Sequence, residues 1–363
     1  MDAAASFSAD YPEAREKFLT AAGTAGASLE RVTNPNRGPD GGELSTDVAW
    51  IGPRDAEAVL VMISGTHGVE GFCGSGAQVD WLTRGEAARL PKGVAALLIH
   101  AINPYGFAWL RRVTEENVDL NRNWVDFDGP PQPLNAGYEV LRDAFCPEAW
   151  TEETRKSTAK VIGAYIAEHG MKAVAAAASS GQYTDPDGIY YGGSEPTWAR
   201  RTQTAIFETY LGQAGRVGIL DYHTGLGPWG FAEQIIIEGH GDPTFERATR
   251  WYGSALASIA DGASASAELS GDGLAAAPQL LKRSEVTGIA MEYGTQPPTQ
   301  VLYALRADNW LHMHGDPAGP DAAAIKAQIR DAFYGDAPDW KGMVAGQSLL
   351  VTRQAVAGLA NGL

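Results

Sequence analysis

The chain has 363 residues, of which 44% are hydrophobic and 20% charged, a composition typical of a globular protein with a large core. It carries 28 Lys and Arg against 44 Asp and Glu, which gives a formal net charge of −16. Such a surface repels nucleic acids and anionic membranes, so we expect neither as a partner. The sequence contains no run of about 18 uncharged apolar residues that could span a bilayer.

The cysteine content and the N-terminal segment favour a cytoplasmic location. The two cysteines, Cys73 and Cys146, are too few for a disulfide framework, and we expect both to be reduced. The first residues contain no basic segment followed by an apolar core, so no signal peptide is expected. We find no internal repeat, and the sequence leaves open whether the protein forms a homo-oligomer.

The pattern of apolar residues predicts helices that alternate with strands. An amphipathic helix is expected first, followed by short apolar runs typical of strands and longer periodic stretches typical of helices. The alternation indicates a mainly parallel or mixed sheet that is covered on both faces. A small, polar segment late in the chain is interpreted as a loop or a loosely ordered crossover. The expected helices are 8–22, 75–83, 159–169, 196–212, 321–333 and 347–359, the expected strands are 59–63, 94–102, 217–220, 234–238 and 287–291, and the loop is 260–277.

Three of the predicted strands end in groups that can bind a metal or transfer a proton. The first is followed by His67 and Glu70, the third by His223, and the last by Glu292. In open α/β sheets, ligands bind beyond the carboxyl ends of the strands, so one sheet could bring these four groups together. Two histidines and a glutamate form a known catalytic zinc set with a fourth position for water.

The segment between these groups carries further motifs. It reads NPYGF at 103–107, then two arginines, then NVDLNRNW at 117–124. With His-x-x-Glu before it and a histidine and a glutamate far after it, the chain resembles the zinc carboxypeptidase superfamily over about residues 59–295. The resemblance implies a three-layer α/β/α sandwich around a mixed, mostly parallel central sheet. We expect one catalytic domain over 1–363, with helix 8–22 and the helices of 321–359 packed on it.

The resemblance also implies a metal centre and a general base. His67, Glu70 and His223 would hold one zinc ion per chain, and zinc lowers the pKa of a bound water to about 7. Glu292 would take a proton from that water and return it to the leaving amine, a role that contributes roughly 10²–10⁴-fold to the rate. Asp221, which precedes the second histidine by two residues, would orient a ligand or form a turn at the strand end.

The arginines and one asparagine complete the implied site. One of Arg111 and Arg112, more plausibly Arg112, would polarise the scissile carbonyl group. Asn121 and Arg122 would bind a substrate carboxylate, with Arg111 as a further candidate for that contact. An arginine fork suits this task because it can donate two parallel hydrogen bonds to a carboxylate.

The implied function is zinc-dependent hydrolysis of an amide bond in a small carboxylate-bearing substrate, such as an N-acylated amino acid or a small peptide. The phrase VDLNRN at 118–123 is similar to the branch that contains aspartoacylase and succinylglutamate desuccinylase, and the motifs at 181–183 and 190–193 favour a bacterial branch. The mobile-loop tyrosine of the digestive members has no clear match. A carboxypeptidase acting on peptide C-termini and a non-catalytic zinc-bearing binding protein stay open as alternatives.

Two other patterns point elsewhere and are weaker. The run GLGPWG at 225–230 spells a dinucleotide-binding fingerprint, but that site needs a helix to follow, whereas 231–238 predicts a strand. The pair His312 and His314 could ligate metal in an amidohydrolase barrel, yet it lies near the end of the chain, and a structural pair is expected. No Gly-x-Ser-x-Gly elbow of a serine hydrolase is present near Ser75.

Overall fold

The protein is built around one mixed sheet, seen in a computed structural model that describes residues 2–362. The described residues form eight strands in the order β1-β2-β4-β3-β5-β8-β6-β7. The four central strands β4, β3, β5 and β8 are parallel to one another, whereas β1, β2 and β6 run antiparallel to neighbours. The mostly parallel sheet expected from the sequence is therefore confirmed. The strands are β1 (Ser28–Arg37), β2 (Glu43–Ile51), β3 (Ala58–Ile63), β4 (Val94–His100), β5 (Arg216–Trp229), β6 (Ala232–Ile236), β7 (Leu256–Ser258) and β8 (Glu285–Gly294).

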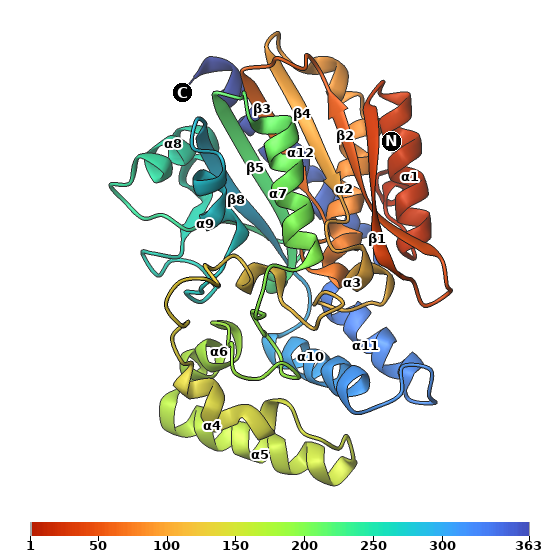
Figure 1. Cartoon of the computed structure of the whole chain (residues 1–363), viewed down its shortest axis with the longest axis vertical. Coiled ribbons are helices and arrows are strands. Elements are labelled where there is room, and N and C mark those ends of the chain that lie inside the picture. Colours follow the sequence, from red (N-terminus) through yellow and green to blue (C-terminus); the bar gives the residue numbers. More distant parts are fainter. Residues whose placement is uncertain (1, 363) are drawn as a thin grey trace.

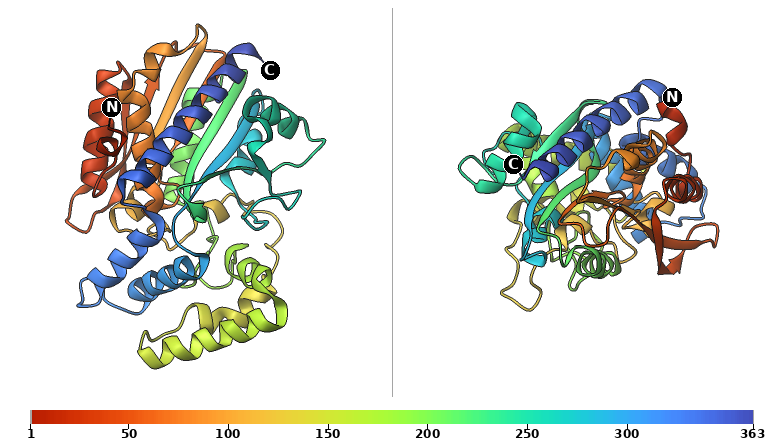
Figure 2. Two further views of the ribbon diagram at one scale, coloured as in Figure 1. Left: turned by 180° about the vertical axis from the view of Figure 1, so that it is seen from behind. Right: turned by 90° about the horizontal axis from the view of Figure 1, so that it is seen from above.

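Helices cover both faces of this sheet and complete the three layers. In Figure 1, α7 crosses the front of the sheet, and α12 lies behind it; Figure 2 shows α12 running along the back. The back layer also contains α1, α2 and α8, and the front layer also contains α9. No helix within residues 2–362 combines the length and apolarity needed to cross a membrane. The helices of the two layers are α1 (Tyr11–Thr24), α2 (Gly71–Thr83), α7 (Trp198–Leu211), α8 (Pro243–Tyr252), α9 (Gly273–Leu280) and α12 (Pro338–Asn361).

The central strands are buried on both faces, which explains their continuous apolar sequences. In β3, every residue from Ala58 to Ile63 is buried. Val59 and Val61 contact the cluster beneath α7, whereas Leu60 and Met62 contact the cluster beneath α12. Because strand side chains alternate between the faces, one short run supplies both cores.

A second group of helices, which we call the helical cap, lies beyond the carboxyl ends of the central strands, at the bottom of Figure 1. Arg306 joins its parts: the guanidinium donates to the carbonyl oxygens of Ala144 and Phe145 at 2.6 and 3.2 Å and to Thr158 Oγ1 at 2.7 Å. The cap thus faces the edge of the sheet where the candidate residues were expected. Its helices are α4 (Ala136–Phe145), α5 (Glu152–His169), α6 (Met171–Ser179), α10 (Pro298–Met313) and α11 (Ala322–Phe333).

Several local expectations need correction. The first helix begins at Tyr11 rather than Ser8, because Asp10 caps it by accepting a hydrogen bond from Glu13 N at 2.9 Å. The segment 260–277 is not a loop throughout, since α9 begins at Gly273 behind the capping residue Asp272. The last helix begins well before residue 347. The glycine run at 225–230 lies in β5 and a turn before β6, so it forms no dinucleotide site.

Candidate metal centre and active site

Two of the sequence motifs meet through their glycines directly after β3. His67 is followed by a single 3-10 turn, Gly68–Glu70, which continues into α2. A Cβ atom at Gly68 would lie 2.0 Å from the carbonyl carbon of Gly106, in the short helix α3 (Pro104–Ala108). Only glycine permits this approach, so the NPYGF motif packs directly against the His-x-x-Glu turn.

The backbone of the two arginines binds the same turn and decides which side chain reaches the site. Gly68 N and Val69 N donate to the carbonyl oxygens of Arg112 and Arg111 at 3.1 and 2.8 Å. Arg112 then points at the turn, with Nη1 2.9 Å from Glu70 Oε1. Arg111 points away: its Nε lies 3.2 Å from an oxygen of Asp308, and it does not line the cavity described below.

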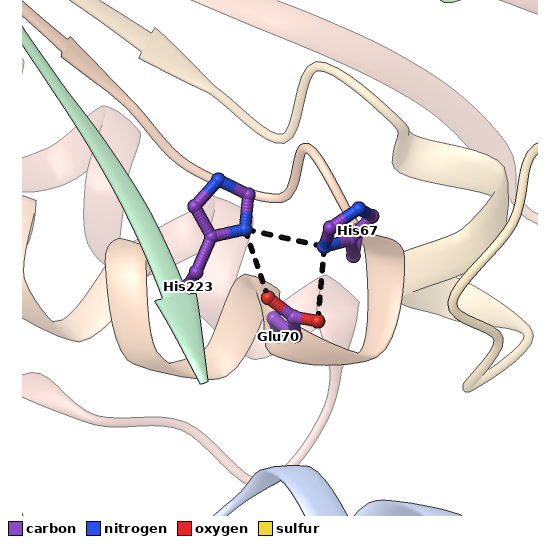
Figure 3. A group of neighbouring side chains, drawn as sticks. All are labelled: His67, Glu70 and His223. Carbon is purple, nitrogen blue, oxygen red and sulfur yellow. Dashed lines mark hydrogen bonds and ion pairs between the residues drawn. The ribbon is translucent and has the colours of Figure 1, made fainter. Parts of the chain in front are cut away.

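His67 and Glu70 follow the end of β3, His223 lies on β5, and Figure 3 shows the polar atoms of the three side chains facing one another. Nδ1 of His67 is 3.0 Å from Glu70 Oε1, and Nδ1 of His223 is 3.1 Å from Glu70 Oε2. The two Nδ1 atoms are 3.1 Å apart. All three side chains are buried, and within residues 2–362 no other group of three such residues could hold a metal ion.

The outer nitrogens of both rings face carboxylates. Nε2 of His67 lies 3.1 Å from Asp119, and Nε2 of His223 lies 3.0 Å from Asp221, which accepts a further bond from Thr66 at 2.8 Å. If both Nε2 atoms donate to these carboxylates, both Nδ1 atoms carry lone pairs. Two lone pairs and a carboxylate then converge on one point, an arrangement that suits a metal cation. The donor set therefore fits a metal ion.

One contact in this set requires the opposite ring tautomer. Arg112 Nη2 lies 2.8 Å from Nε2 of His67, and a guanidinium can only donate. That bond would place the proton of His67 on Nδ1, facing Glu70. A cation between the rings selects the other tautomer, with Nε2–H donating to Asp119, because a metal needs the Nδ1 lone pair.

The electrostatics of the centre also favour a cation. Burial raises the pKa of Glu70, but His67, His223 and Arg112 outweigh it, and the net pKa lies well below its ordinary value. Burial lowers the pKa of His223, but Asp221 and Glu70 outweigh it and raise the net pKa well above the ordinary value. The carboxylates of Glu70 and Asp221 thus favour a positive charge at His223, which a bound cation can supply.

Glu292 lies beside this centre on the neighbouring strand. It pairs with His223 in the parallel register of β5 and β8, and its Oε1 accepts a hydrogen bond from Leu226 N at 3.0 Å. Burial, followed by the charge of Glu70, raises the pKa of Glu292 to about 8. A carboxyl group with a pKa near neutrality can both accept and return a proton.

A cavity of ≈ 150 Å³ lies between the sheet and the helical cap, lined by His67, His223 and Glu292 among others. Asn121 and Arg122 also line it. Asn121 Oδ1 accepts from Gly273 N at 3.3 Å, and its Nδ2 lies 3.5 Å from His223 Nε2. These contacts fix the asparagine between the loop before α9 and the metal centre.

Arg122 faces the cap side of the cavity. Its Nε donates to the carbonyl oxygen of Ser179 at 3.0 Å and its Nη1 to that of Asn121 at 2.9 Å, while Nη2 also bonds Ser179. Three of its five N–H groups are thus used, which leaves two for a ligand. The ring of Tyr190 lies under both arginines, 5.0 Å from the guanidinium of Arg112 and 5.5 Å from that of Arg122.

The sequence reasoning assigned no role to several residues that the structure places at the site. Asp119 lies inside the VDLNRN motif and could have been found there. Tyr190 lies in the motif at 190–193, and its φ of 54° marks a backbone held in a sparsely populated region. Asp272 and Leu274 belong to the segment interpreted as a loop. His312 forms a hydrogen bond with Lys326 at 2.7 Å, as a structural histidine would.

Comparisons with known proteins agree with this architecture. A family model described as "Protein of unknown function (DUF2817)" matches residues 7–347. No curated protein matches the chain. Bovine thrombin-activatable fibrinolysis inhibitor, solved in complex with tick carboxypeptidase inhibitor, is 9% identical with a TM-score of 0.52, and the match covers 98% of each chain. This likeness shows a shared carboxypeptidase-like fold, so the resemblance indicated by the motifs is confirmed at the level of the fold.

Two further solved structures match with lower scores. Carboxypeptidase A from Helicoverpa armigera is 12% identical with a TM-score of 0.42, over 89% of this chain and 73% of that one. Succinylglutamate desuccinylase from Chromobacterium violaceum is 14% identical with a TM-score of 0.36, over 84% and 74%. Identities this low do not carry an activity from one protein to another.

Proposed function

Because the chain belongs to the DUF2817 family and has a carboxypeptidase-like fold, we propose that it is a zinc-dependent hydrolase. The bond cleaved is an amide in a small molecule that carries a carboxylate, such as an N-acylated amino acid or a small peptide. One observation carries the proposal. The converging acceptors of His67, Glu70 and His223 stand beside a buried glutamate, Glu292, whose pKa is raised to about 8.

His67, Glu70 and His223 would hold the ion, with Asp119 and Asp221 fixing the histidine rings. Bound zinc lowers the pKa of a coordinated water to about 7 and polarises a carbonyl group. A positive charge at the centre favours the ionised form of Glu292, which moves its pKa from about 8 toward neutrality. The carboxylate, held by Leu226 N, is then available to accept a proton from water.

Glu292 has a use in hydrolysis that it lacks in a binding protein. The proton taken from water must reach the leaving nitrogen, because an amine departs far more readily than an amide anion. A single carboxyl group with a pKa near neutrality can make both transfers. This favours an enzyme over the non-catalytic alternative.

Arg112 would meet the carbonyl oxygen of the substrate. Its guanidinium is fixed by Asp119 and Glu70, each at 2.9 Å, so it needs no reorganisation when charge develops. Burial lowers the pKa of Arg112, but Asp119 outweighs it and raises the net pKa, so the group stays cationic. Arg122 and Asn121 would bind the substrate carboxylate and align the scissile bond, whereas Arg111 is occupied by Asp308.

The experiment that tests the proposal measures metal and activity together. Purified protein should contain about one zinc per chain by elemental analysis, and a chelator should abolish hydrolysis of N-acylated amino acids until zinc is restored. His223→Ala should lower zinc occupancy, whereas Asp55→Asn, a change on the exposed surface, should not. Protein that binds no zinc and hydrolyses these amides equally well with a chelator present would contradict the proposal.

A further inference from the structure

The cavity beside the metal centre has two chemically different sides. The cap side carries Arg122 and Tyr190. The opposite side is formed by β6, β8 and the segment that leads into α9, and no cationic side chain lines it. Apart from Glu292, Ser266 and Asp272, its lining side chains are aliphatic, among them Ile235, Ile237, Ile259, Leu269, Leu274 and Ala290.

The alternation of side chains along β8 explains why there is space on this side. Ile289, Met291 and Tyr293 point to the back of the sheet and are fully buried beneath α12. Gly288 and Ala290 point to the front, on the same face as Glu292, and are only partly buried. Two small residues in succession leave a hollow in an otherwise filled layer, one pleat behind the candidate base.

The walls of this hollow follow from the strand register and from α9. Ile235 on β6 lies directly opposite Ala290, just as Glu233 lies opposite Glu292. A Cβ atom at Gly288 would lie 3.0 Å from Leu274 Cδ2, so Leu274 covers the glycine and closes the far end. The hollow is therefore floored by Ala290, walled by Ile235 and closed by Leu274.

The loop over the hollow, residues 259–272, is attached at both ends. Near its start, the carboxylate of Glu233 accepts hydrogen bonds from Ala265 N at 3.1 Å and Ser264 Oγ at 3.1 Å. Near its end, the carbonyl oxygen of Gly271 accepts from Trp124 N at 3.2 Å. These bonds hold the loop's apolar side chains against the cavity.

Apart from the candidate base Glu292, Asp272 is the charged residue that lines this side, and its carboxylate has backbone partners. Its Oδ1 accepts from Leu274 N at 2.7 Å and from Ala275 N at 3.1 Å, as the N-cap of α9. A carboxylate here repels an acidic group of a ligand. The chemistry of this side therefore suits a group that is uncharged and aliphatic.

We infer that this hollow is a specificity pocket for a branched aliphatic side chain of the substrate. The inference rests on the proposed function and names its substrate class: amides formed by the amino group of leucine, isoleucine or valine. With the carboxylate on Arg122 and the amide at the metal centre, the side chain on the same carbon can enter the hollow. Acidic amino acids are excluded, because they would meet Asp272 and no cation.

The first test ranks substrates by kcat/KM. N-acetyl derivatives of leucine, alanine, aspartate, lysine and phenylalanine serve as probes. A hydrophobic pocket distinguishes one methylene by roughly 10–200-fold, so the leucine derivative should exceed the alanine derivative by at least about 10-fold. The aspartate derivative should rank below alanine.

Two variants should shift this ranking in opposite directions. Ala290→Leu fills the hollow and should remove the advantage of leucine over alanine. Leu274→Ala opens the closed end and should raise kcat/KM for the phenylalanine derivative about 10-fold relative to that for the leucine derivative. Ala323→Leu, the same substitution as the first but on the exposed face of α11, should keep the ranking of the unmodified protein.

A binding measurement separates the inference from the proposed function. Calorimetry with zinc-loaded Glu292→Gln measures affinity for the same five probes without turnover. If the leucine derivative binds best but the native protein hydrolyses none of the probes, the pocket is upheld and the hydrolase is refuted. Two outcomes would refute the pocket and uphold the hydrolase. In one, the native protein hydrolyses the aspartate derivative best; in the other, it hydrolyses the lysine derivative best and loses this preference in Asp272→Asn. Binding of none of the probes would overturn the pocket.

Discussion

The sheet and the helical cap are held together by different forces. The sheet is fixed by two large clusters of buried apolar side chains, one on each face, which draw on nearly every central strand. The cap has only smaller clusters and relies on buried charge: Arg306 joins α10 to α4 and α5, while Asp308 binds both Arg111 and Lys326. Apolar packing is insensitive to pH, whereas a buried charge depends on its partner.

This difference suits the position of the site between the two regions. The proposed metal ligands and Glu292 come from the sheet side, where the register of β5 and β8 places His223 beside Glu292. The cap contributes the carbonyl oxygen of Ser179 that holds Arg122, and Tyr190 lies in the loop that follows α6. We therefore expect substitutions on the sheet side to affect chemistry, and those on the cap side to affect stability and substrate affinity.

The largest effect is expected on the sheet side. Glu292→Gln preserves the acceptor for Leu226 N but cannot relay a proton, so kcat should fall by about 10²–10⁴-fold. Zinc content and the far-UV circular dichroism spectrum should be unchanged. Unimpaired turnover in this variant would remove Glu292 from the mechanism.

The next effect is expected in the cap. Asp308→Asn leaves Arg111 and Lys326 buried without a countercharge and should lower the free energy of unfolding in urea by about 3–5 kcal/mol. Asp336→Asn, which breaks partly exposed pairs with Arg330 and Lys341, should cost no more than about 1 kcal/mol. Equal losses in the two variants would show that burial of the charge is irrelevant.

The same aspartate predicts a pH dependence. Burial raises the pKa of Asp308, but Lys326 and Arg111 outweigh it and lower the net value. A carboxyl group whose pKa is lowered on folding contributes stability above its unfolded value of about 3.9, and this contribution disappears as pH falls through the folded value. The stability difference between the native protein and Asp308→Asn should therefore shrink below about pH 4, as urea titrations at several pH values would show.

A third substitution tests the contact between the cap and the substrate. Arg122→Ala should lower kcat/KM for a substrate with a free carboxylate by a factor that corresponds to about 2–4 kcal/mol. Amidation of that substrate carboxylate should lower kcat/KM of the native protein by a similar factor. Both changes together should cost little more than either one, because they remove the same contact. Additive losses would show that Arg122 does not bind the carboxylate.

A smaller effect is expected behind the metal-binding residues. Asp221→Asn removes the charge that orients His223 and should weaken zinc affinity by about 10–100-fold in competition with a chromophoric chelator. The fold should persist, because Thr66 can still donate to the side-chain oxygen. Affinity equal to that of the native protein would mean that Asp221 only shapes the strand end.

The smallest effect is expected at Tyr190. Tyr190→Leu removes the ring beneath Arg112 and Arg122 and should raise KM by a factor that corresponds to about 0.5–2 kcal/mol, with little change in kcat. Tyr190→Phe keeps the ring face and should retain the native KM. If phenylalanine behaves like leucine, the hydroxyl group rather than the ring is required.

The parts of the sheet that the sequence predicts well are the central parallel strands β4, β3, β5 and β8. Their apolar runs are continuous, and their ends carry the His-x-x-Glu pair, His223 and Glu292. Strands β1 and β2 were not predicted. The sequence of β1, SLERVTNPNR, is mostly exposed and shows little apolar character, and polar residues interrupt the apolar run of β2, ELSTDVAWI, although that strand is buried. Helix α9 was missed because its cap, Asp272, lies in a run of small residues.

Residues of the candidate site could be predicted where they belong to a sequence motif. They could not be predicted where only the folded structure brings them to the site. Arg111 and Arg112 are adjacent and chemically identical, so local sequence cannot decide which faces the metal centre. The decision depends on two backbone hydrogen bonds to the turn after His67. The aliphatic hollow has no motif, because its walls come from β6, β8 and α9, which meet only in the folded protein.

The separation of the metal-binding residues along the chain has a consequence for the order of folding events. Glu70 and His223 are 153 residues apart, so the centre cannot exist until β5 has joined β3. Such long-range pairing forms slowly compared with local helices. An ion that needs both residues arrives after the rate-limiting closure, so it should slow unfolding without accelerating refolding. Under the proposed function, the first retention of zinc would mark the stage of folding at which β5 has joined β3.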